Sequence, residues 1–140
     1  MASELMNSEN LSEFAERYAE AWCSQNPENI ARFFAENGSL SINNGPPAIG
    51  RASIAREAQA FMTTFPDMVV TFDKLESRGD LTAFHWTLSG TNTGPGGTGN
   101  KVRISGYELW RIGNNGLIAE SQGLFDAAEY ERQLRNQPRG

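Results

Sequence analysis

Apolar residues in the first part of the chain recur at helical spacing. From Leu11 to Trp22 they lie three, four and seven positions apart, which places them on one face of a helix. A second helix is expected to begin at Asn26-Pro27-Glu28, where a capping amide, a proline and an acid occupy favoured positions. Asn37-Gly38 is expected to end that helix. A third helix is predicted from about Ala52 to Thr64.

The pattern changes to alternation in the second part of the chain. Phe84, Trp86 and Leu88 alternate with polar neighbours, as in a strand with one buried face. Asn114-Asn115-Gly116 separates two further runs, and Asn-Gly is a typical hairpin signal. Further strands are predicted near residues 40–42, from residue 68, and over 102–112 and 117–125, with a closing helix over 127–135. Helices followed by an antiparallel meander indicate an α+β fold.

Length and charge narrow the class of protein. The 140 residues are enough for one domain, assigned here to residues 10–136, with a flexible N-terminus at 1–9 and a tail at 137–140. The net charge is −5 and no Lys/Arg cluster exists, so nucleic acid is not an expected partner. No apolar stretch approaches the roughly 18 residues of a membrane span. The first residues lack the pattern of a signal peptide, which makes the cytoplasm the expected location.

Cysteine and histidine are scarce, which limits the available chemistry. Cys23 and His85 are the single residues of their types, so an internal disulfide and a multi-histidine metal site are excluded within one chain. Neither a metal nor a cofactor is expected, and carboxylates become the natural acid/base groups. His85 alternates with Trp86, so we expect Trp86 to face the core and His85 the other side of the sheet.

Four stretches of sequence follow one another in a characteristic order. They are Phe65-Pro66-Asp67, WTLSGTNTG at 86–94, VRISGYELWR at 102–111 and NGLIAE at 115–120, with Asp126 at the end of the last strand. Together they resemble the SnoaL-like polyketide cyclase family of the nuclear transport factor 2-like, or ketosteroid isomerase-like, superfamily. The resemblance implies a cone-shaped, strongly curved antiparallel sheet of the cystatin-like type. Its concave face would be covered by the N-terminal helices around a hydrophobic pocket, and its convex face would form a homodimer.

The resemblance also implies a catalytic acid. The related cyclases carry one where Asp126 ends the last strand, and their reaction abstracts a proton next to a carbonyl before an intramolecular aldol closure. Asp126 with Glu129 is also a capping pattern for the last helix, so both interpretations stand. Relatives often have an acid at the place of Glu108. That residue is expected either to face inward and pair with Asp126, or to be a surface charge opposite Arg103 or Arg111.

A binding site for a small hydrophobic molecule is expected among the aromatic residues. Those expected to line a cavity, or alternatively to fill a solid core, are Tyr18, Trp22, Phe33, Phe61, Phe65, Trp86 and Trp110. Gln122 shares the strand parity of Asp126 and is expected to hold a carbonyl oxygen of the ligand. Asn92 stands where many relatives have histidine, and it retains hydrogen-bonding capacity.

Two classes of function are therefore weighed. The first is a cofactor-free enzyme of cyclase-like or isomerase-like type, which uses acid/base chemistry on a small hydrophobic carbonyl compound. The alternative is a protein of the same fold without catalysis, either a small-molecule-binding protein or a dimeric assembly module. Fold alone does not decide between them, because the same scaffold supports unrelated activities.

Overall fold

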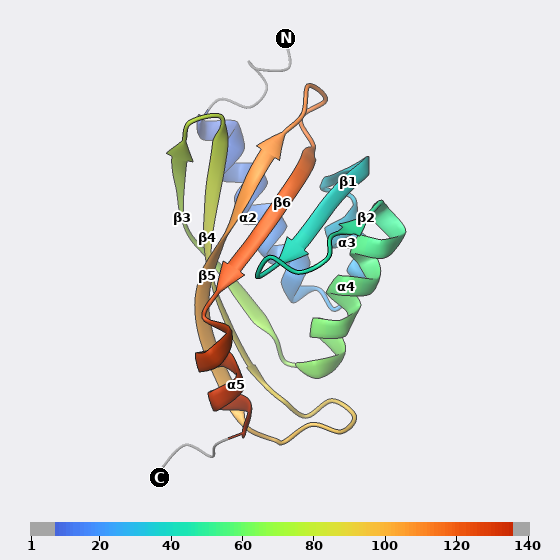
Figure 1. The fold of residues 1–140 in the computed structure, drawn as a ribbon, viewed down its shortest axis with the longest axis vertical. Helices are drawn as coiled ribbons and strands as arrows, with labels where there is room; N and C mark the ends of the chain where they lie inside the picture. The colour runs from blue at the N-terminus through green and yellow to red at the C-terminus, as the bar shows by residue number, and fades with distance from the viewer. Residues whose placement is uncertain (1–7, 136–140) are drawn as a thin grey trace.

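A computed structural model describes residues 8–135, in which helices border one six-stranded sheet (Figure 1). In chain order the elements are α2 (Ser8–Cys23), α3 (Pro27–Ala31), β1 (Phe34–Ile42), β2 (Ala48–Ile49), α4 (Arg51–Thr64), β3 (Val69–Arg78), β4 (Leu81–Thr91), β5 (Lys101–Ile112), β6 (Ile118–Phe125) and α5 (Ala127–Arg135). The helices come mainly before the β3–β6 meander, which confirms the predicted α+β class. The predicted N-terminal segment at 1–9 lies mostly outside the described residues, although α2 already begins at Ser8, and the predicted tail at 137–140 lies wholly outside them.

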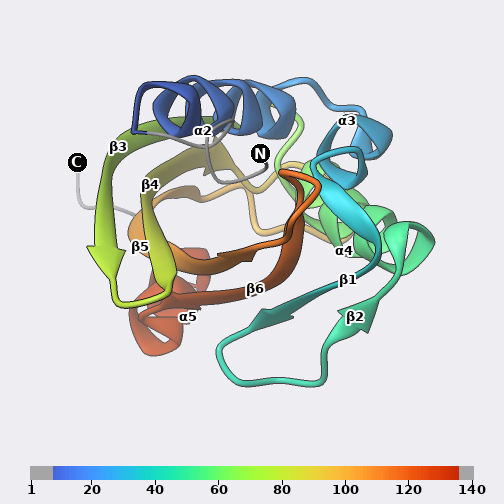
Figure 2. The same ribbon diagram turned by 90° about the horizontal axis from the view of Figure 1, so that it is seen from above.

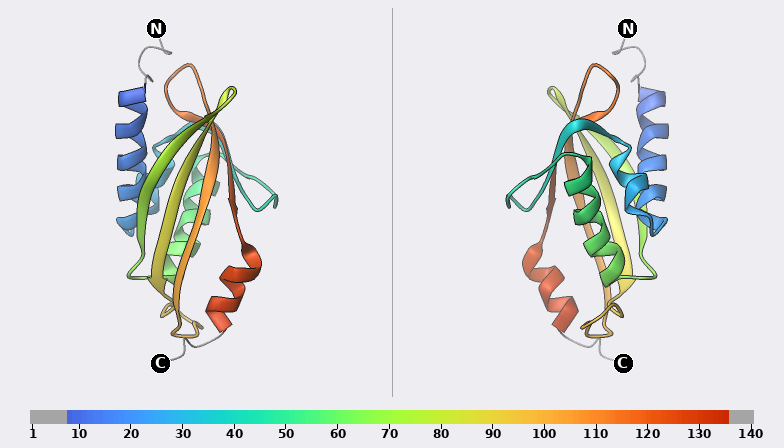
Figure 3. Two further views of the ribbon diagram at one scale, coloured as in Figure 1. Left: turned by 90° about the vertical axis from the view of Figure 1, so that its left-hand side faces the viewer. Right: turned by 90° about the vertical axis from the view of Figure 1, so that its right-hand side faces the viewer.

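The six strands form one curved sheet (Figure 2). Its strand order is β2-β1-β6-β5-β4-β3. β1 runs parallel to β6, and every other neighbouring pair in this sheet is antiparallel. Figure 2 shows the long strands curving beneath α2, with α3 and α4 beside it. In Figure 3, α2 and α5 lie on different sides of the strands. The N-terminal helices therefore cover the concave face, as expected.

The second helix is shorter than the sequence pattern predicts. It ends at Ala31, and β1 begins at Phe34, so the expectation that Asn37-Gly38 ends a helix is wrong. Gly38 lies within β1, where a Cβ atom would come within 2.9 Å of the Ile118 carbonyl oxygen. Glycine is needed there because two parallel backbones approach closely, at a register shift in the pairing of β1 with β6.

Stacked and edge-on rings form the core between α2 and the sheet. Phe84 and Trp110 stack with their centroids 4.9 Å apart, and Tyr18 meets the Trp110 ring edge-on at 5.2 Å. All three residues are fully buried. Such ring pairs stabilise a core beyond the area that they bury. The core is therefore packed with aromatic rings on the side where α2 faces β4 and β5.

The convex face of the sheet carries polar side chains beside Tyr107 and Leu109. His85 lies there, with its Nε2 atom 2.9 Å from Glu76 Oε1, while its neighbour Trp86 is buried on the other face. The predicted alternation of these two residues is therefore confirmed. A homodimer across this face stays a prediction, and so does the cytoplasmic location.

Candidate active site

A pocket opens on the concave side of the sheet. It has a volume of about 590 Å³ when the space at its mouth is counted. The lining residues come from both helices and strands, and they are Trp22, Leu40, Ile42, Phe61, Val70, Phe84, Trp86, Leu88, Ile104, Glu108, Gly123, Phe125 and Tyr130. Twelve of these thirteen present apolar or aromatic surface, and the remaining one, Glu108, is a carboxylic acid. Pockets of this composition are typical of sites for small apolar ligands with one polar anchor.

Exposure distinguishes the mouth of the pocket from its floor. Ile42, Phe61, Phe125 and Tyr130 are partly exposed, whereas the other lining residues are buried. The mouth therefore lies between the end of β1, α4, the end of β6 and α5. Glu108 is only 6% exposed and belongs to the floor. A ligand that reaches Glu108 leaves bulk water behind.

Three neutral groups hold one oxygen of Glu108. Its Oε1 atom accepts hydrogen bonds from the Tyr18 hydroxyl at 2.9 Å, the Trp110 indole N–H at 3.0 Å and the Ser121 hydroxyl at 2.8 Å. The donors come from α2, β5 and β6, so the carboxyl group is positioned by three separate elements. Its rotamer is fixed as a result, which is what an acid/base group in a preorganised site requires.

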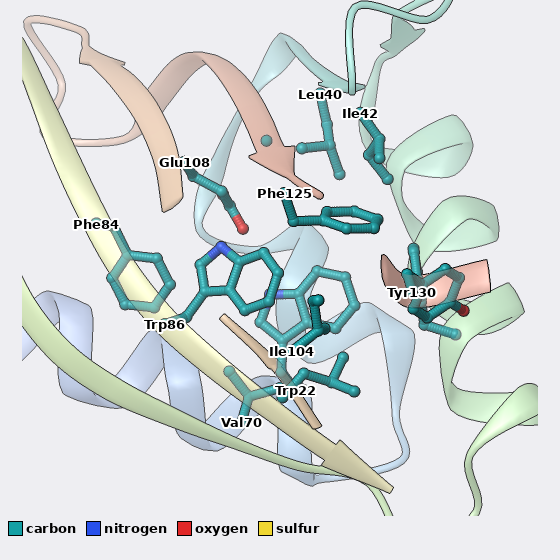
Figure 4. A pocket seen from close by; sticks show the side chains of 13 residues that line it. Trp22, Leu40, Ile42, Val70, Phe84, Trp86, Ile104, Glu108, Phe125 and Tyr130 are labelled. Atoms are coloured by element: carbon teal, nitrogen blue, oxygen red, sulfur yellow. The ribbon is translucent and has the colours of Figure 1, made fainter. Parts of the chain in front are cut away.

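The second oxygen of Glu108 is open to the pocket. None of the hydrogen bonds described for residues 8–135 reaches Oε2. Over the same residues, the fully buried side-chain atoms without a partner are Trp86 Nε1 and Asn100 Oδ1, and Oε2 is not among them. Oε2 therefore borders open space. Figure 4 shows the carboxyl group directed into the pocket, on the side of the Trp86 indole nitrogen.

Burial and hydrogen bonding act on Glu108 in opposite directions. Burial raises the pKa of its carboxyl group above the ordinary glutamate value, because the charged form loses its hydration. The bonds from Trp110, Ser121 and Tyr18 oppose that rise because they stabilise the carboxylate. The same environment raises the pKa of Tyr18 well above its ordinary value, chiefly through burial and also through the charge of Glu108. Tyr18 consequently remains a hydrogen-bond donor.

Glu108 and the seven predicted aromatic residues divide into three groups. Trp22, Phe61, Trp86 and Glu108 line the pocket. Tyr18 and Trp110 lie directly behind it and donate to Glu108. Phe33 and Phe65 do not line it: Phe33 packs edge-on against Tyr18, and Phe65 is fully buried against Tyr130.

Asp126 and Gln122 lie away from the pocket. Asp126 is exposed, and its Oδ1 accepts a hydrogen bond from the Glu129 backbone N–H at 3.0 Å, so it caps α5. Gln122 is exposed on the outer side of β6. The inner side of this strand is formed instead by Ser121, Gly123 and Phe125, and Glu108 pairs with Gly123. The two carboxylates therefore do not meet, contrary to the expected pairing.

Asn92 organises the loop that joins β4 to β5. It is buried, its side chain donates to the Thr98 hydroxyl at 3.3 Å, and it is not among the pocket-lining residues. Its backbone N–H donates to the Asn100 carbonyl at 2.9 Å, which closes the base of that loop. Its contribution is to local structure rather than to the pocket surface.

Sequence reasoning missed nine lining residues and one donor. The nine are Leu40, Ile42, Val70, Phe84, Leu88, Ile104, Gly123, Phe125 and Tyr130. Alternation with Trp86 and Glu108 would have identified the lining residues on β4 and β5. The donor, Ser121, lies opposite Trp110 in the pairing of β5 with β6, which no local pattern predicts.

The described part of the chain has neither a cluster of metal-binding side chains nor a helix suited to cross a membrane. Within residues 8–135, no group of three or more His, Cys, Asp or Glu side chains is arranged to hold a metal ion. In the same part of the chain, no helix has the length and apolar character that crossing a membrane requires.

The curved sheet with helices on its concave face has the nuclear transport factor 2-like, or ketosteroid isomerase-like, fold. The sequence profile of the SnoaL-like polyketide cyclase family matches residues 12–134. This chain therefore belongs to the SnoaL-like polyketide cyclase family. No curated protein sequence matches the chain at a significant level.

Solved structures support the same fold. A ketosteroid isomerase-like protein from Catenulispora acidiphila, solved in complex with trimethylamine, has a TM-score of 0.76 at 20% identity, over 90% of this chain and 94% of its own. A SnoaL-like protein from Jannaschia sp. CCS1 has a TM-score of 0.80 at 16% identity, over 95% and 96%. TsrD from Streptomyces laurentii has a TM-score of 0.78 at 19% identity, over 92% and 97%. Identities this low show the shared fold alone.

Proposed function

We propose that this protein is a cofactor-free enzyme of cyclase or isomerase type that acts on a small hydrophobic carbonyl compound. Glu108 is the proposed proton carrier. The supporting observation is one buried carboxyl group at the floor of an apolar pocket, fixed at Oε1 and open at Oε2. The family to which the chain belongs supports the same class of reaction.

In the proposed reaction, Oε2 of Glu108 accepts a proton from the carbon next to the substrate carbonyl. The C–H electron pair forms an enolate. In a cyclisation, the enolate carbon bonds to a second carbonyl carbon, and the new alkoxide recovers the proton from Glu108. In an isomerisation, the proton returns to a different carbon. A pKa raised by burial suits both halves of this cycle, because the group is a stronger base and can still return the proton.

A neutral chromogenic probe tests the proposed base without knowledge of the natural substrate. 5-Nitrobenzisoxazole loses its ring C–H proton to a base, its N–O bond breaks, and a coloured phenolate forms. We expect Glu108→Gln to lower kcat/KM for this probe by about 10²-fold or more. The amide keeps an oxygen for Tyr18, Trp110 and Ser121, and circular dichroism and thermal unfolding check that the variant is folded.

Asp126→Asn is the matched comparison, because it removes the other acid predicted from the sequence. We expect the rate of this variant to stay near the wild-type value, since Asp126 is exposed and bonded to α5. A loss of activity confined to Asp126→Asn would identify Asp126, rather than Glu108, as the proton carrier. A wild-type protein that binds the probe and turns it over no faster than acetate would favour the non-catalytic binding function.

A further inference from the structure

Glu108 is a buried acid without a counter-ion. Its three hydrogen-bond donors, Tyr18, Trp110 and Ser121, are all neutral. Among the described residues that line the pocket, none is Lys, Arg or His. A buried charge is costly unless it is paired, so the ionised carboxylate lacks the partner that would offset its lost hydration. A ligand that carries a positive charge would supply that partner.

The walls of the pocket are suited to the same kind of ligand. Six aromatic side chains line it, from five different elements, and they are Trp22, Phe61, Phe84, Trp86, Phe125 and Tyr130. The faces of aromatic rings carry partial negative charge and attract cations, and aromatic cages are a common receptor for methylated ammonium groups. Such groups also present apolar methyl surface, which the remaining aliphatic lining residues would cover.

The polar atoms at the floor also favour a cation over an acceptor. Figure 4 shows Trp86 Nε1 beside the Glu108 carboxyl group, and this nitrogen is fully buried without a partner. Oε2 of Glu108 is open to the pocket, as described above. A ligand that enters therefore meets the carboxylate oxygen rather than the indole N–H, and its complementary group is positive.

We propose that the pocket binds small hydrophobic ammonium ions, with the charge placed against Oε2 of Glu108 and the methyl groups against the aromatic walls. This goes beyond the proposed function, because it concerns another class of ligand and requires no turnover. Tertiary and quaternary ammonium ions are preferred over primary ones, since a primary ammonium group loses more hydration when it is buried.

Binding of such a cation is linked to a proton on Glu108. The cation favours the ionised carboxylate, so its affinity falls when the pH drops through the raised pKa of Glu108. The other titratable groups that face the site are Tyr18 from α2 and Tyr130 from α5, and burial raises the pKa of both. The lining residues from β1, α4, β3, β4 and β6 do not titrate. Glu108 therefore governs the pH dependence below neutrality.

An isosteric pair of probes tests the proposal. The 4-(hydroxymethyl)phenyltrimethylammonium ion and 4-tert-butylbenzyl alcohol have the same shape and differ in one atom, N⁺ against carbon. We expect the cation to bind wild-type protein at least about ten-fold more tightly at pH 8, measured by calorimetry. Glu108→Gln should remove that preference. Glu120→Gln is the matched control, because it removes an exposed charge on the outer face, which pairs with Arg111 at 3.5 Å.

A pH series on the wild-type protein keeps the test independent of any variant. The Kd of the cation should rise as the pH falls from 8 to 5, while that of the alcohol stays constant. Equal binding of the two probes, or binding of neither, would overturn the proposal, and so would a preference that survives in Glu108→Gln. The proposed function is tested separately, because the benzisoxazole probe is neutral. Cation binding without turnover contradicts only the enzyme, and turnover without cation binding contradicts only this inference.

Discussion

The carboxylates on the two faces of the sheet have different partners, and their pKa values are shifted in opposite directions. On the outer face, Glu76 pairs with Arg78 at 3.1 Å and with His85 at 2.9 Å, and Arg78 also lies 4.8 Å from the centre of the Tyr107 ring. Hydrogen bonds from His85 and Arg78 lower the pKa of Glu76. On the inner face, Glu108 has neutral partners, and burial raises its pKa.

This difference shows where the molecule retains unfavourable electrostatics. The outer carboxylate is solvated, paired with Arg78 and hydrogen-bonded to His85, which makes it ordinary surface structure. The inner carboxylate is desolvated, unpaired in charge and aimed into a pocket. Acids with perturbed pKa values in apolar clefts are candidates for function, because a purely structural role would be served as well by a neutral residue. Equivalent substitutions of carboxylates on the two faces should therefore have very different effects on stability and activity.

The largest effect is expected from Glu108→Ala. Alanine would leave the buried donors of Tyr18, Trp110 and Ser121 without their acceptor. Orphaned buried groups of this kind cost about 3–5 kcal/mol of unfolding free energy together. Glu108→Gln is the matched control, because its amide oxygen still accepts from the same donors. Urea unfolding measures both variants, and equal stability of the two would show that the three bonds contribute nothing.

A smaller effect is expected at the glycines of the inner face. In Gly106→Ala, the new Cβ atom would lie 2.5 Å from the Leu124 carbonyl oxygen and 2.7 Å from Trp86 Cζ2. One of these neighbours is backbone, so the sheet must shift, and we expect a loss of about 1–3 kcal/mol in urea unfolding. Gly123→Ala provides the comparison, since its Cβ would meet nothing closer than 3.5 Å. A Gly123→Ala loss as large as that of Gly106→Ala would contradict this steric account.

The sequence predicted the elements better than it predicted the site. The helix over 51–64 and the strands of the meander follow from local periodicity, and the structure confirms them. The inner face of β6 does not follow, because Leu124 and Phe125 are both apolar and either could face the core. A register shift between Arg111 and Ile112 also changes which β6 residues point inward. The prediction from strand alternation therefore put Gln122 and Asp126 on the pocket side of the sheet, whereas both lie outside the pocket.

The hydrogen-bond partners of Glu108 cannot be predicted from local sequence patterns. Its inward direction was one of the two predicted outcomes, because it shares parity with Gly106 and Trp110. Two of its donors, Tyr18 and Ser121, come from α2 and β6. They meet the carboxylate only when the helix packs on the sheet and the last strand pairs with β5. Tertiary packing of this kind leaves no signal in the spacing of residues.

The contribution of Glu108 to the stability of the fold depends on pH. The folded-state pKa of Glu108 is raised, so the folded protein holds this proton more tightly than the unfolded chain does. The stabilising contribution is complete below the ordinary glutamate pKa and is lost as the pH rises through the folded-state pKa. We expect the stability of the wild type relative to Glu108→Gln to fall as the pH rises above the ordinary glutamate pKa. Urea unfolding of both proteins at several pH values measures this, and a difference that rises with pH contradicts it.

The smallest effect is expected from Glu76→Gln on the outer face. The substitution removes a carboxylate that is paired with Arg78 and hydrogen-bonded to His85, yet exposed ion pairs contribute little because water and salt screen them. We expect no resolved change in the urea midpoint, and no change in turnover of the benzisoxazole probe. The pair with Arg78 should weaken further at high salt, which gives a second measurement. If Glu76→Gln unfolded as readily as Glu108→Ala, the distinction between a solvated carboxylate on the outer face and a buried, uncompensated one on the inner face would be wrong.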